Sequence, residues 1–338
     1  MARTPDTILL AHGGGGRMAR ALLRDVVLKH FSNDSLNALG DAAVLDAPAG
    51  RLAFTTDSFV VNPLFFPGGD IGKLAVCGTI NDLAVSGAQP LTMSCSLIIE
   101  EGFLIRNLEK ILVSMSRTLQ QAGIRIVTGD TKVVERGAAQ GIFINTAGIG
   151  AVQNPIPSGA HTVQPGDSVL VSGPIGDHGT AVMACREGLE FQGDLRSDCA
   201  PLHSLARALL NTAPHTRFMR DATRGGLAAV LHELCENQAW GVELDETLIP
   251  VRPQVAALCE MLGLDPLHAA NEGTLAAVVP ADQAPAALAA VQAHEHGCGA
   301  ALIGRISTQY PARVCLRTSI GGLRIVDAPS GEQFPRIC

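Results

Sequence analysis

Four aspartates occupy positions where a carboxylate is well placed for chemistry. Asp41 opens an expected strand in LGDAAVL, Asp57 follows one in AFTTDSF, and Asp130 ends one in RIVTGDTK. Asp82 lies in the otherwise apolar stretch LAVCGTINDLAVSG, where an unpaired charge is costly. Because α/β folds bind ligands at strand ends, carboxylates that converge there predict a site for Mg²⁺, which prefers oxygen ligands and substrate phosphates. The alternative is that each aspartate caps a turn or meets solvent.

A run of glycines, Gly13, Gly14, Gly15 and Gly16, separates an expected strand from an expected helix. Free backbone N–H groups in such a loop favour a bound anion. The run is not a dinucleotide-binding fingerprint, because Met18 replaces its last glycine, and it is not a P-loop, because no Gly-Lys-Ser/Thr follows. A phosphate site and a mobile turn are both open interpretations.

Three basic side chains and one glutamate add to the candidate chemistry. Lys132 lies two residues after Asp130, where it would neutralise charge on a transferring phosphoryl group or form a surface ion pair. Arg220 and Arg224 precede a helix that begins with two glycines, which suits either an anion site or a charged helix start. Glu272 comes just before an expected strand, as either a general base or a capping residue.

The nine cysteines form no CxxC pair, which argues against a disulfide framework or a structural zinc site. Cys338 stands at the end of a Pro- and Gly-containing tail that can reach a distant cleft. Its thiol is therefore either a carrier of a substrate group or an inert exposed cysteine. A loop with His294, His296 and Cys298 offers either a soft-metal site or a solvated loop.

The elements that must position these groups alternate between strand and helix patterns. Short strands are expected at Thr7–Ala11 and Asp41–Leu45, and a Pro- and Gly-rich stretch at 153–166 marks a boundary. The pattern predicts two α/β domains, at 1–153 and 154–327, followed by a flexible tail at 328–338. The other expected helices span 17–31, 71–86, 104–121, 180–188, 202–210, 227–236, 255–262 and 284–293, and the other strands 52–60, 124–127, 142–152, 168–172, 241–244, 274–279, 301–306 and a hairpin over 314–326.

Composition narrows the class of protein. Hydrophobic residues make up 47% of the 338 residues, enough for a sizeable core, and the net charge of -7 without a basic stripe argues against nucleic-acid binding. No apolar run approaches the roughly 18 residues that cross a bilayer, and the apolar stretch near the N-terminus is too short for a signal peptide. A cytoplasmic location without membrane attachment is expected.

Several strings occur together in a fixed order: AHGGGG, LGDAAVL, TTDSFVVNPLFFPGGDIGKLAVCGTINDLAVSGAQP, TGDTKVV, RDATRGGL, NEGTL and the terminal PRIC. Nearly end to end, they resemble the HypE family of hydrogenase maturation factors, within the aminoimidazole ribotide synthetase-like superfamily. The resemblance implies a mixed α/β (α+β) fold of two domains. It also implies that the N-terminal sheets pair into a barrel across a homodimer, with ATP sites beside it.

The same resemblance implies an ATP-dependent dehydration. A HypF-type carbamoyltransferase would place a carbamoyl group on Cys338, ATP would activate its oxygen, and the resulting cyano group would pass to iron on a HypC–HypD complex. The implied catalytic residues are Cys338, Lys132 and Glu272, with Mg²⁺ held by Asp41, Asp57, Asp82 and Asp130. The implied nucleotide-binding residues are Gly13, Gly14, Gly15, Gly16, Asn81, Thr128, Gly129, Arg220 and Arg224.

Two other functions are open. A kinase or synthetase of the same superfamily, of the thiamine-phosphate or selenophosphate type, would need no terminal thiol. A selenophosphate synthetase would also carry Cys or selenocysteine with Lys near its glycine-rich loop, whereas this loop has Arg17 and no cysteine. A carrier that binds nucleotide without chemistry is the third possibility, and it would release no phosphate.

Overall fold

Alternating burial along four segments builds the sheet of the N-terminal domain. The computed structural model describes residues 6–14, 16–40, 42–153, 160–189 and 194–328. Its first sheet has the order β1-β6-β4-β5, in which β4 and β5 are parallel and the other pairs antiparallel. Along β1 and β6 every second residue is more buried, because side chains alternate between the two faces of a sheet. The four strands are β1 (Leu52–Phe59), β4 (Ala88–Glu100), β5 (Arg125–Val134) and β6 (Ile142–Val152).

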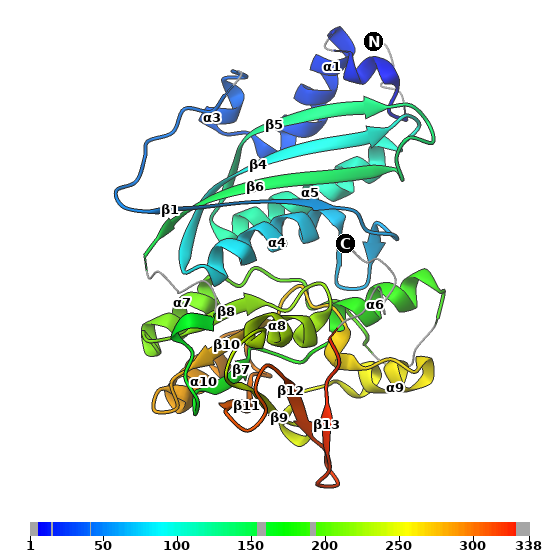
Figure 1. Ribbon diagram of the computed structural model, residues 1–338. Helices are drawn as coiled ribbons and strands as arrows, with labels where there is room; N and C mark the ends of the chain where they lie inside the picture. Colours follow the sequence, from blue (N-terminus) through cyan, green and yellow to red (C-terminus); the bar gives the residue numbers. More distant parts are fainter. Residues whose placement is uncertain (1–5, 15, 41, 154–159, 190–193, 329–338) are drawn as a thin grey trace.

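Two helices cover one face of this sheet (Figure 1). Helix α4 (Ile71–Val85) begins at Asp70, whose side chain accepts hydrogen bonds from the backbone N–H groups of Gly72 and Lys73. It is apolar almost all round, because it lies between the sheet and the C-terminal domain (Figure 1). Helix α5 (Ile105–Ala122) is amphipathic and buries one stripe, as its sequence spacing predicts.

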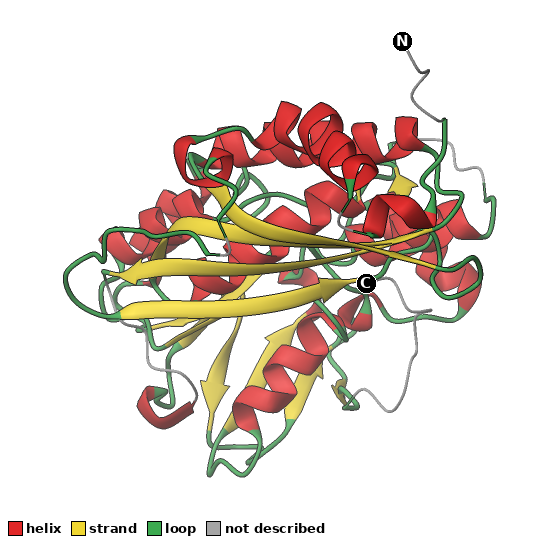
Figure 2. Ribbon diagram, turned by 90° about the horizontal axis from the view of Figure 1, so that it is seen from above, coloured by secondary structure: helices red, strands yellow, loops and turns green. Residues whose placement is uncertain are grey.

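A larger sheet forms the C-terminal domain. Seven strands pair in the order β13-β12-β9-β11-β7-β10-β8, and their neighbours are antiparallel except for β12 and β9. Figure 2, seen from above, shows the long strands of the N-terminal sheet side by side across the molecule. The strands of the C-terminal sheet are β7 (Ser168–Val171), β8 (Phe218–Asp221), β9 (Gly241–Asp245), β10 (Leu275–Val279), β11 (Ala301–Ser307), β12 (Val314–Arg317) and β13 (Leu323–Ile325).

The remaining elements connect and cover these sheets. Near the N-terminus, the helical segment expected at 17–31 forms with a π-helical turn at its centre. The elements around it are η1 (Leu10–Gly13), α1 (Arg17–Leu22), η2 (Leu23–Val27), α2 (Leu28–Phe31), α3 (Asp34–Asn37), β2 (Phe65–Phe66) and β3 (Gly69–Asp70). The C-terminal domain contains η3 (Ala160–Thr162), α6 (Asp177–Arg186), α7 (His203–Thr212), α8 (Gly226–Cys235), η4 (Glu246–Leu248), α9 (Pro253–Leu262), η5 (Pro266–His268) and α10 (Ala284–Gln292).

Two expected strands are wrong. In place of a strand at Thr7–Ala11, only Thr7 bridges to Leu104, and the chain then turns into the 3-10 helix η1. Residues 42–45 form no strand, and Val44 is 93% exposed, so their apolar character does not reflect burial within one chain. None of the helices in the described part of the chain has the length and hydropathy needed to cross a membrane.

Candidate active site

Five of the sequence-predicted site residues line one cavity along β5. The cavity has a volume of about 420 Å³ and lies between that strand and the helical segments near the N-terminus. Its wall includes Gly13, Thr128, Gly129, Asp130 and Lys132. The last two side chains are two positions apart on β5, so they project from the same face of the strand.

The glycine run reaches the cavity through its first residue. A Cβ atom added at Gly13 would lie 2.9 Å from the backbone nitrogen of Val133, so only glycine lets η1 pack this closely on β5. Gly14 and Gly16 do not line the cavity, and added Cβ atoms there would meet either an ordinary contact or open space. Gly15 lies outside the described residues.

A second group of predicted residues lies between the two domains. Asp57, at the end of β1, and Asp82, on α4, are close enough for their carboxyl groups to share a hydrogen bond. Thr55 donates a hydrogen bond of 2.6 Å from Oγ1 to Asp82 Oδ2. Burial and then the charge and hydrogen bond of Asp82 raise the pKa of Asp57 to about 6, opposed by Arg224. Two like charges in one partly buried place favour binding of a proton or a cation.

Two more carboxyl groups extend this acidic group into the C-terminal domain. Burial and the charges of Asp82 and Asp57 raise the pKa of Asp221 to about 7. Glu272 is 3% exposed, and burial raises its pKa well above the usual value, with added effects of Cys199, Asp221, Asp198 and Asp57. A buried carboxyl group with a raised pKa suits a general base that works near neutral pH.

Asp57 and Asp130 stand on the two edge strands of the N-terminal sheet. Strand β1 carries Asp57 and strand β5 carries Asp130, with β6 and β4 between them. Three strand spacings separate such edges by roughly 14 Å. Within the described residues, no three His, Cys, Asp or Glu side chains gather into a group that could hold a metal ion. Asp41, the fourth predicted ligand, lies outside the described residues, as does Cys338.

Asn81 does not line the cavity along β5. It is 1% exposed, and its Nδ2 donates to the carbonyl oxygens of Ala200 (3.1 Å) and Glu272 (3.2 Å). Its Oδ1 accepts a hydrogen bond of 2.8 Å from the backbone N–H of Leu202. The side-chain amide of Asn81 therefore joins α4 to the C-terminal domain, and the nucleotide-binding role of Asn81 stays a prediction.

Other predicted groups take ordinary structural places. Arg220 pairs with Glu233 on the exposed side of α8, whereas Arg224 lies near the acidic group. In the HEHGC loop, His294 Nε2 and Ser204 Oγ are 3.0 Å apart, and Cys298 is exposed. The soft-metal interpretation of that loop finds no support among the residues that the structure describes.

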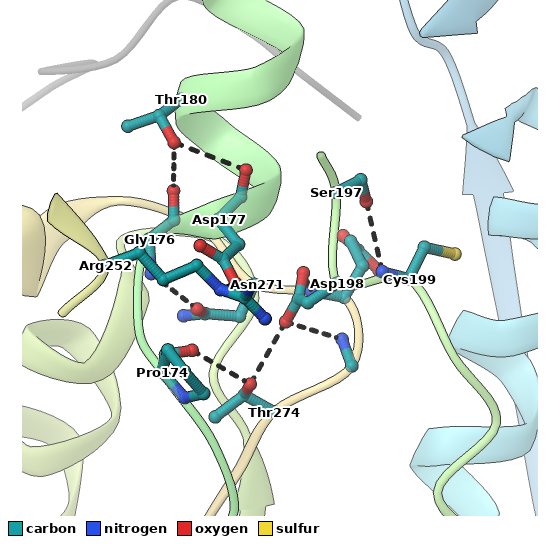
Figure 3. Close-up of polar contacts among 12 residues, drawn as sticks. Pro174, Gly176, Asp177, Thr180, Ser197, Asp198, Cys199, Arg252, Asn271 and Thr274 are labelled. Carbon is teal, nitrogen blue, oxygen red and sulfur yellow. Dashed lines mark hydrogen bonds and ion pairs between the residues drawn. The ribbon is translucent and has the colours of Figure 1, made fainter. Parts of the chain in front are cut away.

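Sequence inspection missed several residues that hold Glu272 in place. Asp198, in the segment SDCAP, accepts hydrogen bonds from the backbone N–H groups of Glu272 and Gly273, both at 2.9 Å. Asn271 accepts a hydrogen bond of 2.7 Å from the backbone N–H of Gly176 (Figure 3). No local pattern marks either residue, because their partners are distant in the sequence.

Comparison with known proteins identifies the family. The model of the AIR synthase related protein N-terminal domain matches residues 39–152, and that of the corresponding C-terminal domain matches residues 164–313. The chain is 52% identical to the carbamoyl dehydratase HypE of Rhizobium leguminosarum bv. viciae, over 97% of this chain and 94% of that protein. The chain belongs to the HypE family of carbamoyl dehydratases. It is therefore a dehydratase, a lyase that acts in hydrogenase maturation.

Solved structures of the HypE family share this fold. One, a crystal structure of the hydrogenase maturation protein HypE in complex with ATP, has a TM-score of 0.94 at 44% identity and covers 98% of this chain and 100% of its own. Another, of a HypE–HypF complex, has a TM-score of 0.79 at 46% identity and covers 91% of this chain and 100% of its own. These likenesses extend over both domains and support the predicted two-domain α/β architecture of the aminoimidazole ribotide synthetase type.

Proposed function

We propose that the enzyme uses ATP to dehydrate a carbamoyl group carried on the thiol of Cys338. The carbamoyl oxygen attacks the γ-phosphorus of ATP, and ADP leaves. Amide oxygen is a poor leaving group, whereas the phosphorylated oxygen leaves readily as phosphate. Loss of both N–H protons and cleavage of the C–O bond then leave a thiocyanate on the sulfur. The cyano group becomes a ligand of the iron in a [NiFe] hydrogenase.

The cavity along β5 is the proposed ATP site. The related HypE structure contains ATP, and the cavity has both polar and apolar walls and a volume of about 420 Å³, within the range of small-molecule sites. Thr128 and Gly129 on β5, together with the Gly13–Gly16 loop, would contact the phosphates. Lys132 on the same strand would neutralise charge that develops on the transferring phosphoryl group. Arg224 would bind phosphate from the domain interface. Arg220, in the same segment, is a further proposed phosphate-binding residue.

Magnesium is the proposed partner of the acidic residues. The carboxyl groups of Asp57 and Asp82 lie within hydrogen-bond distance of each other. Carboxylate oxygens are the ligands that Mg²⁺ prefers. The raised pKa of Asp57 indicates a place where a bound cation would be stabilised. Asp41 is a further proposed ligand, and Asp130 would contribute from the cavity along β5, at the opposite edge of the sheet from Asp57. When bound, Mg²⁺ supplies positive charge that balances the ATP phosphates.

Glu272 is the proposed base that removes an N–H proton from the phosphorylated intermediate. Its burial among acidic neighbours is the observation that carries this proposal, because an ordinary exposed glutamate is too weak a base. The carboxyl group takes up the proton and becomes neutral, which lowers the charge of the crowded acidic group. The proton transfer therefore reduces the electrostatic repulsion between Glu272 and its acidic neighbours.

A homodimer would complete the enzyme. The sheet face opposite α4 and α5 exposes the apolar side chains of Phe54 (70% exposed), Leu52 (51%) and Ile98 (40%). Large apolar side chains that are exposed on one sheet face favour an interaction surface. A second copy on this face would close the two N-terminal sheets into a barrel.

The proposed partners follow from the chemistry of the carried group. A HypF-type enzyme would load Cys338, as the HypE–HypF complex suggests for a relative, and a HypC–HypD complex would accept the cyano group. Both exchanges take place with partner proteins, for which we propose a cytoplasmic location. They also favour a flexible tail at 328–338, which follows the proposed domains at 1–153 and 154–327. At up to about 3.6 Å per extended residue, eleven residues span roughly 40 Å.

Isotope transfer tests the proposed reaction. The enzyme is loaded with a carbamoyl group whose oxygen is oxygen-18, and Mg-ATP is added. The proposal predicts that the label appears in the released phosphate, one atom per adduct. Label that stays in the peptide or enters water would contradict phosphorylation of the carbamoyl oxygen. Phosphate released without any change in the peptide would instead favour a free small-molecule kinase, and the absence of phosphate would favour a carrier.

A further inference from the structure

The segment Ser197–Leu202 lies between the two domains and packs directly against the loop that carries Glu272. Its start is fixed by Ser197, whose backbone N–H donates to the Pro67 carbonyl at 2.9 Å and whose Oγ accepts from the Cys199 N–H at 3.1 Å. The Ser197 Oγ also lies 2.8 Å from His178 Nδ1. These contacts leave the residue between them, Asp198, in a defined position (Figure 3).

The Asp198 carboxylate is bonded on both oxygens to the loop after Asn271. Its Oδ1 accepts from the Glu272 N–H, and its Oδ2 accepts from the Gly273 N–H, each at 2.9 Å. The hydroxyl of Thr274 adds a third hydrogen bond of 3.1 Å to Oδ2 (Figure 3). Hydrogen bonds from N–H groups to an ionised carboxylate are roughly twice as strong as those between neutral groups.

Two further contacts show how closely the loop packs on the backbone of the segment Ser197–Leu202. A Cβ atom added at Gly273 would overlap the carbonyl oxygen of Asp198, so the loop approaches without room for a side chain. In return, the backbone N–H of Ala200 donates to the Glu272 carbonyl at 3.3 Å. The backbone of Glu272 is therefore held on both its N–H and its C=O by a single short segment.

We propose that Asp198 is a positioning residue that fixes the Glu272 carboxyl group against the carbamoyl substrate. It touches no reacting atom and acts through the backbone N–H groups of Glu272 and Gly273 and the hydroxyl of Thr274. This inference rests on the proposed role of Glu272 as the base. A displacement of about 1 Å at a reacting group can cost roughly 100-fold in rate, so loss of this clamp is expected to slow the chemical step.

The test compares single-turnover rates of the full-length enzyme, carbamoylated on Cys338 by a HypF-type carbamoyltransferase. Asp198→Ala is expected to lower the rate at saturating Mg-ATP roughly 10- to 100-fold. The ATP concentration that gives half of that rate is expected to stay unchanged. Asp198→Asn keeps the shape of the side chain and one of its two acceptor oxygens, and it is expected to give an intermediate rate. Asp245→Ala is the matched control, because it removes an exposed carboxylate that caps the Thr247 N–H.

Several outcomes would overturn the proposal. A native rate in Asp198→Ala, alongside a slow Glu272→Gln, would overturn the role of Asp198 and leave the role of Glu272 intact. A native rate in Glu272→Gln would overturn both roles. If the half-saturating ATP concentration of Asp198→Ala rises by the same factor as its rate falls, the substitution has damaged the fold in general, and the positioning role is contradicted. If Asp198→Ala does not fold, the Asp198→Asn variant decides, since a native rate in that folded variant contradicts the proposal.

Discussion

The side chain of Asn81 makes three hydrogen bonds across the domain interface, and Asn81→Ala would remove all of them at once. The groups that each lose a hydrogen bond are the carbonyls of Ala200 and Glu272 and the N–H of Leu202, and the Glu272 carbonyl keeps its bond from the Ala200 N–H. At a net value of about 1 kcal/mol for each bond, the loss is about 3 kcal/mol, with a further cost for the cavity. Because Asn81 is not part of the cavity wall, the affinity for ATP is expected to remain native in the folded variant.

Urea denaturation provides the assay. The single tryptophan, Trp240, is buried in the core of the C-terminal domain, so its fluorescence follows unfolding of that domain. The control is Asn37→Ala, which removes an exposed amide that donates to Ser32 Oγ and should cost less than about 0.5 kcal/mol. A loss below about 1 kcal/mol in Asn81→Ala would refute the structural role. A native stability with weakened ATP binding would support the nucleotide-binding role of Asn81.

Three further predictions concern the candidate site. Gly13→Ala should weaken ATP binding about tenfold, because the new Cβ would lie 2.9 Å from a backbone nitrogen of β5. Gly16→Ala, whose Cβ would meet open space, should leave ATP affinity unchanged, and calorimetric titration measures both affinities. Asp82→Asn should lower the pKa of Asp57 from about 6, although burial keeps it above the ordinary value, and a carboxyl NMR titration that finds no shift would contradict the pairing. Turnover should rise with pH, because Glu272 accepts a proton only when it is ionised. The rise should come above the pH near 4.3 at which an ordinary glutamate ionises, because burial raises the pKa of Glu272. The protonated form of that side chain favours the folded state, so its contribution to stability is present at low pH and lost as pH rises through the raised pKa.

Periodicity was sufficient for most of the fold. Helix α5 and strand β6 follow their hydrophobic spacing directly, since each has one covered face. Strand β4 was not expected, although it spans Ala88–Glu100, because its polar residues lie on the open face of the sheet and break the apolar pattern. The strand expected at Asp41–Leu45 does not form in residues 42–45, whose apolar side chains find no cover within one chain.

The candidate site was less accessible from sequence than the fold. Gly13, Asp130 and Lys132 were recognised from loop and strand-end positions, and the structure places all three around one cavity. Sequence could not separate Asp57 from Asp130 in space, because the strand order of a sheet is not written in any local pattern. Asp198 was missed for the same reason, since its hydrogen-bond partners lie more than seventy residues away.

The most direct test of the account is the mass of the C-terminal peptide after the carbamoylated enzyme is mixed with Mg-ATP. If the carbamoyl group is dehydrated on this thiol, the adduct on Cys338 loses the mass of one water, with one ADP formed for each adduct converted. Cys338→Ala should carry no adduct while its affinity for ATP stays native. An alanine variant that still becomes modified, or ADP formed while the adduct keeps its full mass, would contradict the claim that this thiol carries the group that is dehydrated.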